Sequence, residues 1–309
     1  MFTTLMKLSK DQFKKAKDFI FNKGRTLDQA LFKYYFESGR KEVVLRELAL
    51  FQNDDGGFGK GLESDLRSEN SSVIATFHAM HICREIDINY KEYLVKNAVK
   101  YLLESYDPEK KVWPIITDAV RDVPHPWWWQ GDVEKNFGNF LINPSVEILG
   151  ALLDYKELVE SKFLEDNLQI CIDRIETNIK PSVYDIRSCQ FLINSKNLDN
   201  NVRSHIIEVI SPIIKKNIIQ NKEKWNGVDF NPTNIIHSPS SPFIDIIGRE
   251  LLNENLEFDI KNQLEDGSWP LNWSWEEIDP EAWKLADLEW RGHMTLIKLK
   301  LFKEFDNIE

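Results

Sequence analysis

Hydrophobic residues recur every three or four positions along most of this chain, which is the spacing of one face of an α-helix. In the first such stretch, Ser9 and Gln12 have the spacing of a capping box before Phe13, Ala16 and Ile20. The same period predicts helices over residues 41–51, 71–86, 91–105, 145–160, 163–179, 183–195, 202–219, 241–253 and 289–305. Stretches of alternating apolar and polar residues are rare. The pattern therefore predicts an all-α chain of roughly twelve helices.

Two turns of nearly the same sequence lie between predicted helices, one near each end of the chain. They are residues 52–59 (QNDDGGFG) and residues 263–269 (QLEDGSW). The glycines supply positive φ angles, and we expect the following aromatic, Phe58 or Trp269, to pack between adjacent helices. Weaker copies contain Trp113 and Trp225, and a degenerate copy spans residues 170–190. We therefore expect about five helix–turn–helix units, each burying its apolar face against its neighbours.

These turns resemble the QW-type repeats, Q-x-x-x-G-x-[FW], of the terpenoid cyclase and protein prenyltransferase superfamily. The resemblance covers most of residues 40–305. It implies an α/α toroid, a barrel of about five to six helix-pair repeats around a central cavity. It also implies a small-molecule ligand in that cavity, namely an isoprenoid or a similarly apolar substrate, with aromatic side chains that stabilise carbocations. Related repeats occur in thioester-containing complement-type domains.

The chain lacks the catalytic and metal-binding motifs that characterised members of this superfamily contain. The acidic D-x-D-D motif of proton-initiated cyclases is replaced by ENSS at residues 69–72. The D-x-C zinc motif of protein prenyltransferases is absent, since Asp185 and Cys189 are four residues apart. Asp54 and Asp55 lack the last acid of a D-D-x-x-D magnesium motif, because residue 58 is Phe58. We therefore expect a separate branch that uses no metal and no cofactor.

Length and composition refine this picture. The 309 residues contain no linker rich in Ser, Gly or Pro, so we expect one domain over residues 1–309, with helices in residues 1–40 leading into the repeats. The net charge of −11 argues against a nucleic-acid partner. Three cysteines indicate a reducing compartment, and we expect Cys171 and Cys189 in the core. With neither a signal peptide nor a membrane-spanning segment in the sequence, the expected location is cytoplasmic.

The beginning of the chain is basic despite the acidic total. Residues 7–25 contain seven Lys or Arg residues and two acids, Asp11 and Asp18. Our main interpretation is a solvated surface helix. The alternative is a peripheral membrane contact, in which this helix lies on an anionic lipid surface.

The first candidate site follows the first glycine turn. Glu63 and Asp65 are one residue apart and Arg67 lies close by, an arrangement that separates carboxyl pKa values. One carboxyl group would then donate a proton while the other assists, and Arg67 would bind substrate. The alternative is that Asp65 caps the next helix or pairs with Arg67.

The second candidate site is residues 121–129 (RDVPHPWWW), where prolines restrict the backbone. His125 is a candidate for proton transfer near neutral pH. Trp127, Trp128 and Trp129 are candidates for binding a cation, a carbocation or a sugar ring. Three consecutive tryptophans cannot all face one side. The alternative is a loop that covers one end of the toroid and buries its tryptophans.

The third candidate region is residues 263–290, with eight acids, one base and five tryptophans. Trp273 and Trp275 are candidate substrate-binding residues, whereas we expect Trp269 to be a repeat packing residue. If this region meets the second candidate site, the two form an aromatic and acidic mouth. His78 and His81 also share a helical face, but a zinc site would need further ligands from elsewhere.

Three functions remain open at this point. The favoured one is a cyclase or prenyl-transfer enzyme that acts on an isoprenoid by acid-assisted chemistry, with Glu63, Asp65 or His125 facing an aromatic cavity. The second is a carbohydrate-active enzyme or sugar-binding toroid with an open polar cleft. The third is a non-catalytic module that binds an unidentified protein partner through an aromatic face.

Overall fold

The computed structural model describes residues 6–116, 122–178, 180–227 and 229–309. Within these residues the chain folds into fourteen α-helices with short 3₁₀ turns, and β pairing is confined to isolated bridges. The predicted all-α class is therefore confirmed. Arg121, in the second candidate site, lies outside the described residues.

The chain divides into two compact units that interleave along the sequence. Unit 1 consists of Met1–Glu47, Ser211–Ser274 and Trp283–Glu309. Unit 2 consists of Leu48–Ile210 and Trp275–Ala282. The single-domain organisation expected from the sequence stays a prediction.

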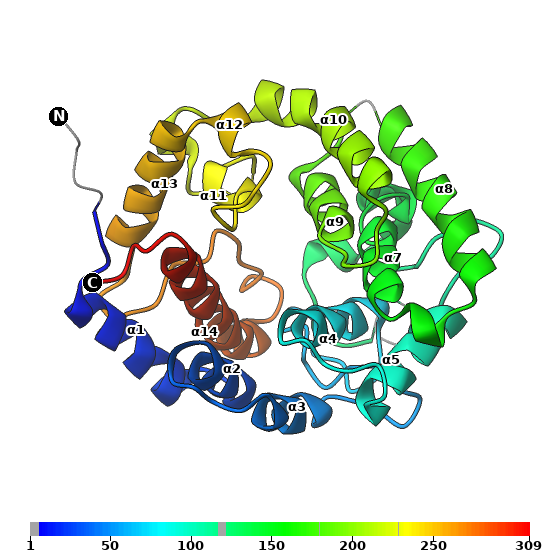
Figure 1. Cartoon of the computed structure of the whole chain (residues 1–309). Coiled ribbons are helices and arrows are strands. Elements are labelled where there is room, and N and C mark those ends of the chain that lie inside the picture. The colour runs from blue at the N-terminus through cyan, green and yellow to red at the C-terminus, as the bar shows by residue number, and fades with distance from the viewer. Residues whose placement is uncertain (1–5, 117–121, 179, 228) are drawn as a thin grey trace. The chain divides into compact units, whose positions relative to one another are not determined.

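Unit 1 contains the helices from the two ends of the chain (Figure 1). Helix α1 packs against α2, and α13 packs against the short helices α11 and α12. Its helices are α1 (Lys10–Lys23), α2 (Thr26–Phe36), most of α3 (Lys41–Ala49), the end of α10 (Asn200–Asn217), α11 (Pro232–Ile235), α12 (Ile244–Ile247), α13 (Arg249–Lys261) and most of α14 (Pro280–Glu304). Its core includes Phe19, Phe32, Leu256, Leu299 and Phe302.

Unit 2 is organised around α7, which packs against α4, α8 and α9 (Figure 1). Helix α4 also packs against α5. The complete helices of this unit are α4 (Val73–Glu85), α5 (Tyr93–Glu104), α6 (Val133–Asn136), α7 (Ser145–Asp154), α8 (Ser161–Thr177) and α9 (Val183–Ile193). Nearly all of α7 is buried, which agrees with its central position.

The two similar turns make the same hydrogen bonds, one turn in each unit. Gln52 Nε2 donates to the carbonyl of Gly56 at 2.9 Å and to that of Leu94, in the first turn of α5, at 3.0 Å. Gln263 Nε2 donates to the carbonyl of Gly267 at 2.9 Å and to a carbonyl in the first turn of α1 at 2.9 Å. Each glutamine therefore closes its own turn and fixes it to the start of a helix.

The glycine in each turn is required by both conformation and space. Gly56 has φ 89° and Gly267 has φ 91°, in the region that favours glycine. A Cβ atom on Gly56 would lie 2.5 Å from the carbonyl oxygen of Asn97 in α5. A Cβ atom on Gly267 would lie 2.3 Å from the carbonyl oxygen of Lys15 in α1. The predicted role of these glycines is confirmed.

The aromatic residues of the repeats are buried, as expected. Phe58 is fully buried, and Trp269 donates its indole N–H to the carbonyl of Asp259 at 2.6 Å. In the weaker copies Trp113 and Trp225 are also buried, and each donates to a backbone carbonyl. The interpretation of Trp269 as a packing residue is therefore confirmed.

Several predicted helix bounds need correction. Helix α14 begins at Pro280 rather than near residue 289, because Asp279 accepts the N–H of Ala282 at 2.9 Å and caps it. The predicted helix 241–253 is two helices, because Gly248 adopts φ 92° between them. Helix α7 ends at Asp154 and is followed by a 3₁₀ turn, whereas a helix to residue 160 was predicted.

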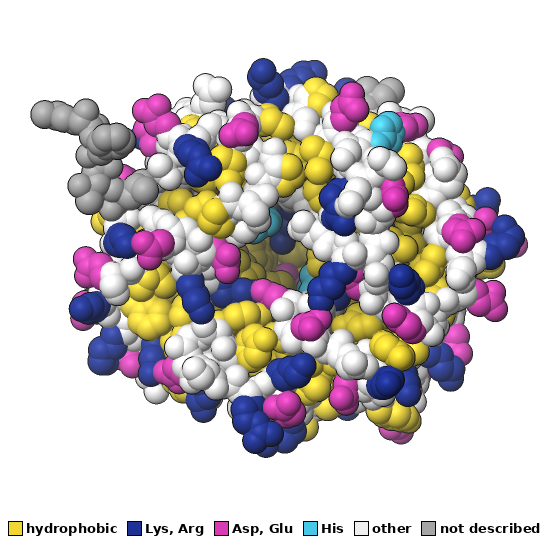
Figure 2. All heavy atoms as spheres, in the orientation of Figure 1, with side chains coloured by type: hydrophobic (Ala, Val, Ile, Leu, Met, Phe, Trp, Pro, Cys, Tyr) yellow, Lys and Arg dark blue, Asp and Glu magenta, His cyan; other side chains and the backbone are white. Residues whose placement is uncertain are grey.

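The basic helix α1 has the predicted capping box, and its apolar residues are buried. Lys14 and Lys15 pair with acids of the same helix, and Lys17 pairs with Glu37 at 2.5 Å. These pairs fit the interpretation of a solvated surface helix, and the membrane contact stays a prediction. Among the described residues, no helix combines the length and the hydropathy needed to cross a bilayer. Acidic and basic side chains are interspersed over the face in Figure 2.

Candidate functional site

Two histidines on α4 each lie against a carboxylate. His78 Nδ1 is 3.0 Å from Glu63 Oε2, and His81 Nε2 is 2.9 Å from Glu147 Oε1. The two imidazole rings are 6.2 Å apart between centroids, because a spacing of three residues places them one turn apart on one face. We call these four residues the α4 site. The side chain of Ser72 caps α4 by accepting the N–H of Ala75.

The α4 site combines buried acids with half-exposed bases. Glu63 is 4% exposed and the side chain of Glu147 is 12% exposed, whereas the side chains of His78 and His81 are 29% and 30% exposed. Burial lowers the pKa of His81 although Glu147 opposes this shift. Burial would raise the pKa of Glu147, but His81 and Arg187 hold it below its usual value. The pair is therefore a neutral imidazole beside a carboxylate at neutral pH.

Aromatic rings enclose the bases of the α4 site. Phe191, on α9, stacks on His81 with centroids 3.9 Å apart and an interplanar angle of 23°. Phe77 lies edge-on to both histidines, with centroid distances of 4.8 Å to His78 and 4.9 Å to His81. Ser188, also on α9, donates its hydroxyl to Glu147 at 3.3 Å. The imidazole rings therefore have apolar neighbours on α4 and α9.

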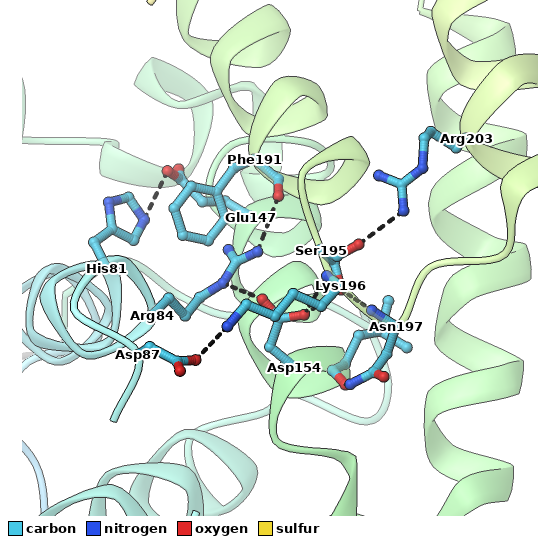
Figure 3. Close-up of polar contacts among 11 residues, drawn as sticks. His81, Arg84, Asp87, Glu147, Asp154, Phe191, Ser195, Lys196, Asn197 and Arg203 are labelled. Atoms are coloured by element: carbon cyan, nitrogen blue, oxygen red, sulfur yellow. Dashed lines mark hydrogen bonds and ion pairs between the residues drawn. The ribbon is translucent and has the colours of Figure 1, made fainter. Parts of the chain in front are cut away.

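A buried ion pair fixes α4 against α7 near this site, as Figure 3 shows. Arg84 Nε is 2.6 Å from Asp154 Oδ2, and both side chains are less than one-tenth exposed. Asp154 Oδ1 accepts the hydroxyl of Ser195 at 2.6 Å and the backbone N–H of Lys196 at 2.7 Å. Since Arg84 follows His81 by one turn, this pair holds the helix that carries both histidines.

Of the predicted residues 63–67, Glu63 belongs to the α4 site, and the roles expected for Glu63, Asp65 and Arg67 stay predictions. Asp65 is 5% exposed and accepts the indole N–H of Trp275 at 2.6 Å. Asp65 is not the cap of α4, because Ser72 has that role. Arg67 contacts the carbonyl of Ser64 at 3.5 Å.

Tyr184 is close enough to Asp65 for the charge of that carboxylate to affect its pKa. Partial burial raises the pKa of Tyr184, Arg187 lowers it, and the charge of Asp65 raises it further. Tyr184 and Arg187 both lie on α9, the helix that also carries Ser188 and Phe191. The segment 63–67 and α9 therefore contribute polar groups to the same part of unit 2.

The loop of the second candidate site, residues 122–129, exposes one of its three tryptophans and buries another. Trp127 is 64% exposed and Trp128 is half-buried, whereas Trp129 is 3% exposed and packs in a cluster that includes Leu66. Trp129 therefore joins the loop to Leu66, which follows Asp65 in the sequence. His125 Nδ1 lies 2.5 Å from the carbonyl of Val123, so its described hydrogen bond stays within the loop.

The tryptophans of the third region belong to different units. Trp275 is in unit 2, where it binds Asp65, and Trp273 is in unit 1, where its ring lies 5.4 Å from that of Trp290. The shared aromatic and acidic mouth stays a prediction.

The described residues hold no group of three or more His, Cys, Asp and Glu side chains placed to bind a metal ion. Cys83, Cys171 and Cys189 are free and buried, and burial raises the thiol pKa of Cys83 and of Cys171 to about 12. The expectation that Cys171 and Cys189 are core residues is confirmed.

From the sequence, His78 and His81 are only weak candidates for zinc ligands, and Glu147 is not a candidate at all. The spacing of the two histidines was a signal, but nothing near residue 147 indicates a partner for His81. The protein-family models and the curated proteins include no match to this chain. The contacts of the α4 site and the resemblance of the two turns therefore supply the grounds for a function.

Proposed function

We propose that this protein is an enzyme that transfers protons to and from its substrate at the α4 site. The observation that supports this most directly is the presence of two carboxylate–histidine pairs on adjacent turns of one helix. Such a pair holds an imidazole in one orientation and stabilises the cation that forms when it takes up a proton. Two pairs within reach of one substrate supply both a base and an acid.

The pKa of His81 identifies the base. Because burial lowers the pKa of His81, its imidazole is neutral at neutral pH and acts as the base. The bond between a substrate atom and its proton breaks, an N–H bond forms on His81, and Glu147 stabilises the resulting imidazolium. His78, held by Glu63, then gives a proton to the substrate, while solvent water takes the proton from His81 and supplies a new one to His78. An imidazolium is too weak an acid to protonate an isolated double bond, so the reacting position is a hydroxyl group or an activated carbon.

The proposed substrate is an isoprenoid or a similarly apolar molecule, and the proposed architecture is an α/α toroid. Support for the architecture comes from the resemblance to QW-type repeats and from the matching hydrogen bonds of Gln52 and Gln263. Support for the substrate comes from Phe77 and Phe191, whose rings lie against the histidines. An apolar chain with one reactive polar group suits such surroundings.

A thermal-shift panel tests the substrate class. The purified protein is heated with farnesyl diphosphate, geranylgeraniol or squalene, and in parallel with cello-oligosaccharides and chitin oligosaccharides. A ligand that binds only the folded protein raises its melting temperature. We expect a concentration-dependent rise with at least one isoprenoid and none with the sugars. A rise with the sugars alone, or with no ligand, would reject the isoprenoid proposal.

A further inference from the structure

Unit 1 contains a carboxylate–histidine pair of its own, separate from the α4 site. Asp28 on α2 is fully buried, and its Oδ2 accepts Arg25 Nε at 3.1 Å. Its Oδ1 lies 3.4 Å from His293 Nδ1 on α14. Burial alone would raise the pKa of Asp28, but Arg25 and His293 hold it below its usual value. Asp28 is therefore an ionised group with two partners.

Close backbone packing brings this pair together. A Cβ atom on Gly292 would lie 3.0 Å from the Cα atom of Gly24, so α14 and the segment before α2 approach at two glycines. The same Cβ atom would lie 3.7 Å from Asp28 Oδ2. Since Asp28 holds Nδ1 of His293, Nε2 is the ring nitrogen that remains for a ligand. The side chain of His293 is 29% exposed.

Two tryptophans extend the pair into a cluster. The ring of Trp290 lies 5.9 Å from that of His293 and 5.4 Å from that of Trp273, and the two indoles are nearly perpendicular at 83°. The Nε1 atoms of Trp273 and Trp290 are buried and have no hydrogen-bond acceptor among the described residues. Trp129 Nε1 also has no acceptor in the described part of the chain, but it lies in unit 2, whereas the indoles of Trp113, Trp225, Trp269 and Trp275 each donate to a protein oxygen. A buried N–H group without an acceptor destabilises the fold, and a ligand that supplies an acceptor removes this cost.

The chemistry of the cluster selects the kind of ligand. Both indole N–H groups are donors only, so they require an acceptor atom. The charges of Arg25 and Asp28 compensate each other. A group with two or more acceptor oxygens and a negative charge satisfies these donors together.

We infer that Trp273, Trp290 and His293 form a binding site for a small oxyanion, the carboxylate or phosphate group of a metabolite. The oxygens accept from the two indole N–H groups, and His293, oriented by Asp28, faces the same group through Nε2. This site lies within unit 1 and is independent of the proton-transfer function proposed for the α4 site.

Indole N–H signals in the NMR spectrum of protein labelled with ¹⁵N-tryptophan test this inference. Trp273→Phe and Trp290→Phe assign the two signals. Sodium succinate and inorganic phosphate are added at constant ionic strength. We expect saturable shifts of both signals, with a dissociation constant of about 1 mM or lower, while the Trp269 signal stays in place. A response to succinate alone or to phosphate alone identifies the group, and either response supports the site.

The variant His293→Gln tests the contribution of His293 to binding. The control is His237→Gln, which changes a histidine at an exposed position of unit 1. Loss of one charge-assisted contact should weaken binding about tenfold in His293→Gln, with no change in His237→Gln. Absence of a saturable shift, the same shift with sodium chloride, or a shift with choline chloride instead would overturn the inference. If the tryptophan variants do not fold, a crystal structure of the wild-type protein with succinate decides. Oxyanion density at both indoles supports the site, and water alone rejects it.

Discussion

Asp154→Ala should strongly destabilise unit 2, because the change removes one partner of a buried ion pair. The variant leaves the Arg84 guanidinium without its carboxylate in a site where both side chains are less than one-tenth exposed. It also removes the acceptor of the Ser195 hydroxyl and of the Lys196 N–H. Loss of one member of a buried pair costs about 3–5 kcal/mol. That is a large part of the roughly 5–15 kcal/mol by which folded domains are stable.

The matched control is Asp87→Asn in the same cluster (Figure 3). Asp87 pairs with Lys196, but the two side chains are 79% and 65% exposed. An exposed pair contributes at most about 1 kcal/mol. Urea unfolding followed by circular dichroism at 222 nm gives the free energy of unfolding of each variant. Equal stability of Asp154→Ala and Asp87→Asn would refute the view that the Arg84–Asp154 pair holds α4 against α7.

Three further predictions concern the turns, the pH dependence and Asp65. Gly267→Ala should lower the free energy of unfolding by about 2–5 kcal/mol. The alanine would have to adopt a positive φ angle, and its Cβ atom would collide with the backbone of α1. The control is Gly248→Ala, because Gly248 has nearly the same φ but no atom within 4 Å of an added Cβ. This variant should lose only about 1–2 kcal/mol of unfolding free energy. Equal losses for the two variants in urea unfolding would contradict the close approach of Gly267 to α1. Since the fold lowers the pKa of His81, its contribution to stability is complete above pH 6.5 and is lost as the pH falls below that value. Urea midpoints at about pH 7 and about pH 5 should therefore differ less in His81→Gln than in the wild type, and an unchanged difference would contradict this. Trp275→Phe should lose about 1.5–3 kcal/mol of stability, because the buried carboxylate of Asp65 loses an indole donor, and calorimetry that shows no loss would contradict that contact.

Local chemistry explains why the repeat turns were predictable. The glutamine, the glycine and the aromatic of residues 52–59 and 263–269 act within or next to their own turn, so their spacing in the sequence carries the information. The start of α14 was also readable, because Asp279 and Pro280 are a common cap and first residue. The apolar period alone placed that start near residue 289, which is wrong.

The break between α12 and α13 shows where the helical period fails. The apolar spacing of residues 241–253 continues across Gly248, but this glycine adopts a positive φ angle and ends the first helix. The period reports which residues face a core and does not report whether the backbone between them is continuous. Short helices such as α6 and α11 have too few residues to show any period.

The α4 site was only partly predictable, because its pairs join distant parts of the chain. Glu63 was identified from its position after a glycine turn, yet its partner is His78 rather than a second carboxyl group. Glu147 meets His81 through the packing of α7 on α4, and no local pattern encodes that contact. Asp28 and His293 are still farther apart in sequence, and neither was identified.

Turnover in D₂O tests the central claim of proton transfer at the α4 site most directly. The protein is incubated with farnesal, an isoprenoid whose aldehyde activates neighbouring C–H bonds, and mass spectrometry follows deuterium uptake at carbon in the substrate or its product. His81→Gln and His78→Gln are compared with His205→Gln, which changes an exposed histidine paired with Glu176 in the same unit. We predict uptake in the wild type and in His205→Gln, and a loss of about 100-fold or more in each α4 variant. Uptake in His81→Gln at the rate of His205→Gln, or no uptake in the wild type, would contradict the claim.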